Sequence, residues 1–307
     1  MKLHHVLEAQ QFDLPTLQRL FETTEQMERV VAQGGTTDYH TRIMASLFYE
    51  PSTRTRFSFE TAMNRLGGRV VSTENAAEFS SVAKGETLED TIRMLNGYAD
   101  VIVIRHYEVG SAKRAAAVSR VPIINAGDGM GQHPTQALLD IYTIRKEIGA
   151  IDGLRIAMVG DLAQGRTVRS LTYLLSKFQG VHLFYVAPPQ LRMKPDILEH
   201  LKEHHVEYVE ETSLEKVLPE VDVVYQTRIQ KERFGDRIAD YEKCRGVYVI
   251  DQNSLRLMKP KSIVMHPLPR LDEIAMTVDS DPRAAYFRQA QNGLYVRMAL
   301  LTMVLSA

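Results

Sequence analysis

Residues 43–66 constrain the fold of this chain more than any other stretch, because a strand pattern runs directly into a helix pattern there. Ile43 to Tyr49 is a short, mostly apolar run of the kind found in buried strands. Glu50-Pro51 is a turn signal. From Phe57 to Leu66, apolar residues recur at the spacing of one helix face. The stretch therefore predicts a buried strand followed closely by a helix.

The junction between that strand and helix, residues 52–56, has the sequence STRTR. The first N–H groups of a helix lack partners within the helix and lie at the positive end of its dipole, so a helix start binds anions. Cations are unfavourable there, yet Arg54 and Arg56 both occur. A bound anion would offset them, with one arginine reaching it while Arg56 pairs with Glu60 at i+4. The spacing alone also fits two ordinary surface arginines.

Strand and helix patterns alternate along the rest of the chain, with a hinge pattern at residues 151–153. Such alternation predicts parallel sheets covered by helices, and 307 residues indicate about two domains. We therefore expect an α/β protein with two Rossmann-like parallel-sheet domains joined by helices. Ligands bind such sheets beyond the carboxyl ends of the strands. The polar groups and turns expected there are Arg54, Arg105, His133, Arg166, Arg228 and Leu268-Pro269.

Composition narrows the class of protein. Lysine and arginine number 37 against 38 aspartate and glutamate, a formal net charge of −1, which argues against a nucleic-acid or polybasic membrane-binding surface. The N-terminus lacks the apolar core of a secretory signal and the arginine-rich pattern of a transit peptide, and no apolar run is long enough to span a membrane. We therefore expect a cytoplasmic protein without a membrane partner.

Several common catalytic motifs are missing from the sequence. Gly160 and Gly165 lack the GxGxxG spacing of dinucleotide sites, and the sequence contains no GxxxxGK[ST], GxSxG or HExxH motif. Cys244 is the single cysteine and is expected to be inert. His4-His5 and His204-His205 fit solvated pairs. We expect neither a metal ion nor a cofactor.

Six ordered motifs together resemble those of the aspartate carbamoyltransferase catalytic chain. The resemblance runs essentially from end to end. The related ornithine enzymes have a cysteine in a His-Cys-Leu-Pro segment, where this chain has proline at position 267. The motifs are FYEPSTRTR at 48–56, KGET at 84–87, HPTQ at 133–136, GRT at 165–167, TR at 227–228 and HPLPR at 266–270.

This resemblance implies a reaction between carbamoyl phosphate and L-aspartate that gives N-carbamoyl-L-aspartate and phosphate, without a covalent enzyme intermediate. It belongs to de novo pyrimidine biosynthesis. The residues implied to bind carbamoyl phosphate are Ser52, Thr53, Arg54, Thr55, Arg105, His133, Gln136, Leu268 and Pro269. Those implied to bind aspartate are Lys84, Arg166, Arg228 and Gln230. The implied catalytic groups are Arg54, Thr55, Lys84, Arg105 and His133.

The resemblance also implies an assembly and a domain motion. Ser80 and Lys84 would reach the active site of an adjacent subunit, which makes a homotrimer obligatory and allows a larger assembly with regulatory chains. Glu50, Arg166 and Arg233 would pair when the domains close. The implied carbamoyl phosphate domain covers 1–148, with the helix at about 285–307 packed back onto it, and the aspartate domain covers 149–284.

Two alternatives remain open from the sequence. One is a carbamoyltransferase that uses another amino acceptor, such as ornithine. The other is a non-catalytic anion-binding or scaffold protein that kept the fold, which predicts broken motifs, whereas every implied catalytic position here holds the expected residue type. Gln132 departs from the glutamate that relatives often carry before the histidine, and we expect it to act only through its neighbours.

Overall fold

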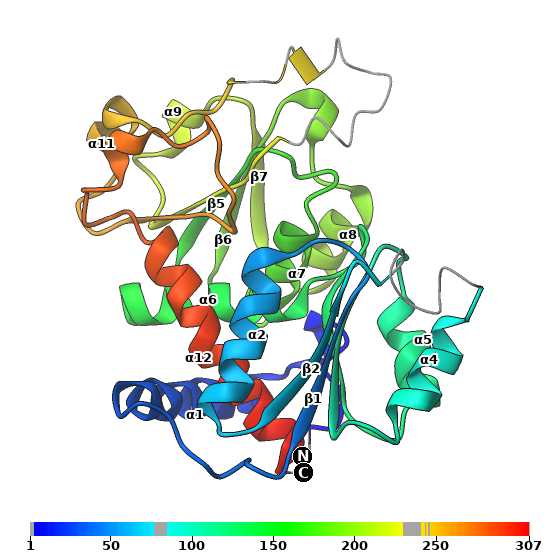
Figure 1. The fold of residues 1–307 in the computed structure, drawn as a ribbon. Helices are drawn as coiled ribbons and strands as arrows, with labels where there is room; N and C mark the ends of the chain where they lie inside the picture. Colours follow the sequence, from blue (N-terminus) through cyan, green and yellow to red (C-terminus); the bar gives the residue numbers. More distant parts are fainter. Residues whose placement is uncertain (1–2, 77–84, 230–240, 243, 245, 307) are drawn as a thin grey trace. The chain divides into compact units, whose positions relative to one another are not determined.

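The computed structural model describes residues 3–76, 85–229, 241–242, 244 and 246–306. The chain divides into two compact units (Figure 1). Unit 1 comprises Met1–Tyr142 and Gln291–Ala307, and unit 2 comprises Thr143–Ala290. Helices α6 (Pro134–Ile148) and α12 (Tyr286–Leu305) each begin in one unit and end in the other.

Unit 1 is built on a four-stranded parallel sheet of order β2-β1-β3-β4. Because β1 pairs with β2 on one side and with β3 on the other, the direction of winding reverses between β1 and β3. The strands are β1 (Ile43–Phe48), β2 (Arg69–Glu74), β3 (Val101–His106) and β4 (Ile123–Asp128).

Helices cover both faces of this sheet (Figure 1). On one face, alternate residues of β1, including Ala45 and Leu47, pack with Ile92 of α4 and Ala112 of α5. The other face meets α2, where Ser46 donates a hydrogen bond to Glu60 at 3.0 Å. The helices described in unit 1 are α1 (Leu14–Ala32), α2 (Thr53–Arg65), α4 (Leu88–Leu95) and α5 (Ser111–Val118), with a 3-10 turn η1 at Ala9–Gln11.

Unit 2 is built on a five-stranded parallel sheet of order β7-β6-β5-β8-β9. Its winding reverses between β5 and β8, so both sheets are doubly wound and the predicted fold class is confirmed. The strands are β5 (Arg155–Val159), β6 (His182–Val186), β7 (Glu207–Glu211), β8 (Val223–Gln226) and β9 (Ile263–Met265). The remaining helices are α7 (Arg166–Leu175), α8 (Pro195–Glu203), α9 (Leu214–Val217) and α11 (Gln252–Leu257), with 3-10 turns at Pro189–Leu191 and Met276–Val278.

One element predicted from the sequence is wrong. The apolar run at residues 247–251 is expected to be a strand, but within the described residues it forms only an isolated bridge between Ile250 and Ile274. Its apolar side chains Tyr248 and Ile250 are instead buried in the core against α9 and α11. Burial therefore accounts for the pattern without a ladder of strand hydrogen bonds.

Among the described residues, the helices are each too short or too polar to cross a membrane.

Candidate active site

Predicted ligands for the phosphate lie at the reversal point of the unit 1 sheet. Arg105 is the next-to-last residue of β3 and lies beside Phe48 of β1, and its carbonyl accepts a hydrogen bond from the Tyr49 N–H at 2.9 Å. The side chain of Arg105 donates from Nη1 to Ser52 Oγ at 3.2 Å, and its Nε lies 3.4 Å from a Glu50 carboxylate oxygen. The chain thus brings together two segments that follow neighbouring strands, at the place where doubly wound sheets bind ligands.

Helix α2 begins at Thr53 with Ser52 as its N-cap. Among the described residues, the Ser52 side chain makes no capping hydrogen bond to this helix and instead accepts from Arg105. The first N–H groups of α2 are therefore available for an anion. Arg54 is exposed beside them, and Thr55 is buried.

Arg56 pairs with two glutamates. Its guanidinium lies 2.9 Å from Glu74 on β2 and 3.7 Å from Glu60, the i+4 residue. The prediction that one of the two arginines pairs elsewhere is confirmed.

Arg105 is a largely buried cation. Burial lowers the pKa of its guanidinium, and the nearby Glu50 carboxylate opposes that shift. Because arginine stays protonated in proteins, the result is a positive charge stripped of much of its water. Such a charge binds an oxyanion more strongly than a fully solvated one does.

The loop between β4 and α6 positions His133. The Asp128 carboxylate accepts hydrogen bonds from the Gly110 N–H at 2.8 Å and the Gln132 N–H at 2.6 Å. The Gln132 side chain also donates to Gln10 at 2.7 Å and accepts from the Ala9 N–H at 3.2 Å. These bonds hold the loop that leads into His133, a buried residue immediately before α6.

Gln136 lies in the first turn of α6 and bonds to Asp140, whose buried carboxylate acts on a buried guanidinium. Its Nε2 donates to Asp140 Oδ1 at 2.8 Å, which leaves its Oε1 as the acceptor facing away from that carboxylate. The guanidinium of Arg297 on α12 is fully buried, which lowers its pKa to about 10, and Asp140 opposes the shift. A side chain at Gly293 would approach Arg297 Nη1 to 2.5 Å, so glycine leaves room for this guanidinium. The sequence analysis missed Asp140 and Arg297, since only the fold brings these distant positions together.

Predicted aspartate ligands lie at the reversal point of the unit 2 sheet. Arg166 is the first residue of α7, after the loop that follows β5, and Arg228 follows β8. The two segments are joined because Thr227 donates from its N–H and Oγ1 to the Val159 carbonyl at 2.9 and 2.8 Å. At Gly160, φ is +112° and a Cβ would lie 2.4 Å from the Thr227 carbonyl oxygen, so only glycine fits.

The HPLPR segment follows β9 of the same sheet. His266 Nδ1 accepts a hydrogen bond from the Leu268 N–H at 2.7 Å, so its Nε2–H donates to Glu273 at 2.7 Å. Arg270 pairs with Asp279 and donates to the Tyr286 hydroxyl at 2.9 Å. These contacts fix the turn that carries the Leu268 and Pro269 carbonyls.

Four predicted site residues, Ser80, Lys84, Gln230 and Arg233, lie outside the described residues. The predicted pairing of Glu50 with Arg166 and Arg233 stays a prediction, and the described contact of Glu50 is with Arg105.

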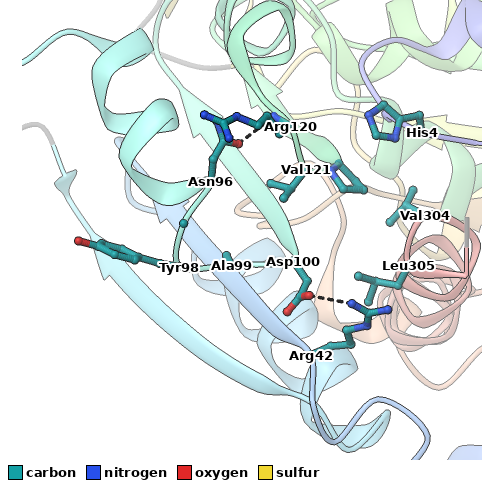
Figure 2. Close-up of a pocket in the computed structure, with 12 residues that line it drawn as sticks. His4, Arg42, Asn96, Tyr98, Ala99, Asp100, Arg120, Val121, Val304 and Leu305 are labelled. Carbon is teal, nitrogen blue, oxygen red and sulfur yellow. Dashed lines mark hydrogen bonds and ion pairs between the residues drawn. The ribbon is translucent and has the colours of Figure 1, made fainter.

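A polar pocket of about 520 Å³ lies elsewhere in unit 1 (Figure 2). Arg42, which precedes β1, bonds to Asp100, which precedes β3, at 2.8 Å. The Asn96 side chain accepts from the Arg120 N–H at 2.9 Å on the same wall. The pocket therefore lies at the amino ends of the strands, opposite the end that carries Arg105, and does not coincide with the predicted phosphate ligands.

Two family models match consecutive parts of the chain. The carbamoyl-phosphate-binding domain of aspartate/ornithine carbamoyltransferase matches residues 4–146, and the aspartate/ornithine-binding domain matches residues 152–304. With two doubly wound sheets and arginines at both reversal points, these matches define a carbamoyltransferase.

Proteins that are similar in sequence and structure show which family of carbamoyltransferases the chain belongs to. The chain is 59% identical to a chloroplastic aspartate carbamoyltransferase of Pisum sativum over 99% of this chain and 79% of that one. The catalytic subunit of M. jannaschii aspartate transcarbamoylase has a TM-score of 0.92 and 48% identity, covering 99% and 98% of the two chains. The Trypanosoma cruzi enzyme in complex with carbamoyl phosphate and aspartate has a TM-score of 0.93 and 44% identity, covering 99% and 97%. The chain belongs to the aspartate carbamoyltransferase family.

Proposed function

We propose that this chain transfers the carbamoyl group of carbamoyl phosphate to the α-amine of L-aspartate, as a step of de novo pyrimidine biosynthesis. The supporting observation is that each sheet carries guanidinium groups at its own reversal point, Arg54 and Arg105 in one and Arg166 and Arg228 in the other. Carbamoyl phosphate and aspartate are both anions, and a guanidinium binds phosphate or carboxylate through paired hydrogen bonds.

In this proposal, carbamoyl phosphate binds to unit 1. Residues 52–55 hold its phosphate with the first N–H groups of α2. Arg105, His133 and Thr55 polarise the carbamoyl oxygen as it becomes a tetrahedral oxyanion. The Oε1 of Gln136 accepts from the carbamoyl NH₂, because Asp140 takes the hydrogen bond of the Gln136 amide nitrogen. The Leu268 and Pro269 carbonyls orient the same NH₂ group.

Aspartate supplies the nucleophile. Arg166, Arg228 and Gln230 bind its two carboxylates, and its neutral α-amine attacks the carbamoyl carbon. The carbon–oxygen bond to phosphate then breaks, the electron pair leaves with phosphate, and the amine loses a proton. Holding the two reactants in line contributes about 7–11 kcal/mol to lowering the barrier.

The proposed functional unit is a homotrimer in which Ser80 and Lys84 complete the site of an adjacent subunit, and a larger assembly would add regulatory chains to this trimer. Lys84 would add a further cation for the phosphate and for aspartate. Pairing of Glu50 with Arg166 and Arg233 would favour the closed form after aspartate binds.

An acceptor assay tests the proposed function. We expect the purified chain to form N-carbamoyl-L-aspartate from carbamoyl phosphate and L-aspartate, with one phosphate released per product. L-ornithine in place of L-aspartate is the matched control and should give no more than background. Turnover with ornithine instead would establish the alternative acceptor, and no turnover with either would favour a non-catalytic scaffold.

A further inference from the structure

Three side chains at the carboxyl end of α8 form a cluster outside the proposed active site. His200 and His204 are four residues apart, which puts them on one side of the helix, and their ring centroids lie 4.0 Å apart. One potential ligand atom from each of His200, Glu203 and His204 lies within 4.8 Å of the others. His200 is half-buried, whereas Glu203 and His204 are exposed.

Hydrogen bonds set the tautomer of His200. Ser176 Oγ donates to the Tyr173 carbonyl at 3.1 Å, so this hydroxyl accepts from the His200 Nε2–H at 2.9 Å. The Nδ1 atom of His200 therefore carries a lone pair. The Tyr173 ring packs edge-on against the imidazole at 4.7 Å and holds its plane.

The tautomer of His204 is set in the same way. Its Nδ1 lies 2.8 Å from the His200 carbonyl oxygen, which can only accept, so Nδ1 carries the hydrogen and Nε2 carries the lone pair. Histidines that bind metals typically donate their other ring N–H to a carbonyl or similar acceptor, which fixes the tautomer. Each ring therefore keeps one nitrogen lone pair for a metal ion while its other nitrogen donates a hydrogen bond.

The local charge also suits a cation. His204 is the C-cap of α8, where the unpaired carbonyl groups form the negative end of the helix dipole. Glu203 adds a carboxylate to the cluster, and Lys177 is a positive charge near His200 that a bound ion has to overcome.

We propose that His200, Glu203 and His204 form a binding site for a divalent transition metal ion, with zinc as the ion tested. Two imidazoles and one carboxylate are a ligand set that zinc accepts, whereas magnesium and calcium prefer oxygen ligands. In the zinc peptidases with a His-x-x-Glu-His motif the two histidines bind the ion, which supports His200 and His204 as ligands, and Glu203 is the further ligand proposed here. Zinc holds its nitrogen and oxygen ligands at about 2.0–2.2 Å, and the exposed Glu203 and His204 side chains have room to turn to that distance.

The site has a structural consequence separate from carbamoyl transfer. The ligand His200 lies on α8 and is bonded to Ser176, which comes just after α7, so a zinc ion bound there would help to hold the two helices together. It would stabilise unit 2, because any ion that binds only the folded state raises the stability of that state. In this proposal His204 binds the ion, whereas its sequence neighbour His205 does not.

Titration of zinc into the full chain tests this inference. Calorimetry measures the binding of zinc, and thermal unfolding measures its effect on stability. We expect zinc to bind and to raise the melting temperature, while magnesium at the same concentration does neither. His204→Ala removes an exposed ligand and should weaken zinc binding at least about tenfold. Glu203→Gln, which keeps the side-chain shape, should weaken it less.

His205→Asn is the matched control, because His205 is the adjacent exposed histidine and asparagine tolerates its φ of +54°. This variant should bind zinc as the parent does. Equal zinc affinity in the parent and His204→Ala, or equal weakening by His205→Asn, would overturn the inference. Carbamoyl transfer is not the readout, so failure of the proposed function would leave this result intact.

Discussion

A single desolvated guanidinium, that of Arg105, carries much of the proposed oxyanion stabilisation. We expect Arg105→Ala to lower kcat about a hundredfold or more, since loss of one oxyanion donor costs roughly 3–4 kcal/mol. Steady-state kinetics with saturating carbamoyl phosphate and aspartate measure this effect.

Arg93→Ala is the control for that experiment, because Arg93 is an exposed arginine of unit 1 whose ion pair with Asp90 lies within one helix turn. It should keep nearly the parent kcat. Near-parent turnover of Arg105→Ala at saturation would remove Arg105 from the proposed chemistry.

The buried, oppositely charged side chains of Asp140 and Arg297 lead to a prediction about stability. Asp140 is fully buried, and Asp140→Ala would leave the Arg297 guanidinium buried without that carboxylate. Removing a carboxylate that compensates a buried cation in this way costs roughly 3 kcal/mol. Equilibrium urea unfolding measures the loss, and Asp140→Ala combined with Arg297→Met should recover part of it. A single variant as stable as the parent would show that Arg297 does not depend on Asp140.

At the scale of an element, the starts of α1 and α2 provide a matched comparison. Asp13 caps α1 by accepting from the Thr16 N–H at 2.9 Å, whereas Ser52 accepts from Arg105 instead of capping α2. We expect Asp13→Ala to lower the free energy of unfolding by about 1 kcal/mol without changing substrate binding.

Ser52→Ala should do the reverse, weakening carbamoyl phosphate binding while stability changes by less than about 0.5 kcal/mol. Urea unfolding and binding titration of both variants provide the comparison. A large stability loss for Ser52→Ala with unchanged binding would mean that Ser52 serves the helix and not the ligand.

The elements also show how far the sequence could predict the fold. The strand and helix of residues 43–66 were predictable because burial and turn chemistry agree there. Helix α5 was missed, since its SAKRAAAV sequence has no strong apolar period and follows a Gly110 N-cap without a side chain to signal it. Helix α12 begins at Tyr286, close to the expected start at about residue 285, and just before it Ala284 forms a bridge with Val264 of β9.

The same limit applies to the candidate site. Its arginines follow strands and were predictable from local sequence, because parallel strands deliver residues to one end of a sheet. The contact of Arg105 with Ser52, and the burial of Arg297, depend on strand order and on helix packing. Neither has a local pattern in the sequence.

At the scale of the whole molecule, the proposed shared site predicts complementation between inactive variants. Arg54→Ala and Lys84→Ala should each be nearly inactive alone. If Lys84 serves an adjacent subunit, reassembled mixtures should regain activity, because some sites then receive both native residues. Solution size measurement should show a trimer, and a fully active monomer would contradict the shared site.

The central claim is that each reversal point serves one substrate, and calorimetric titration of carbamoyl phosphate alone tests it most directly. We predict that Arg54→Ala loses at least about tenfold in affinity, because it removes a charge-assisted contact worth roughly 1.5–3 kcal/mol. Arg228→Ala should bind carbamoyl phosphate as the parent does, and its defect should appear only in the KM for aspartate. Equal loss of carbamoyl phosphate affinity in both variants, or loss in Arg228→Ala alone, would contradict the account.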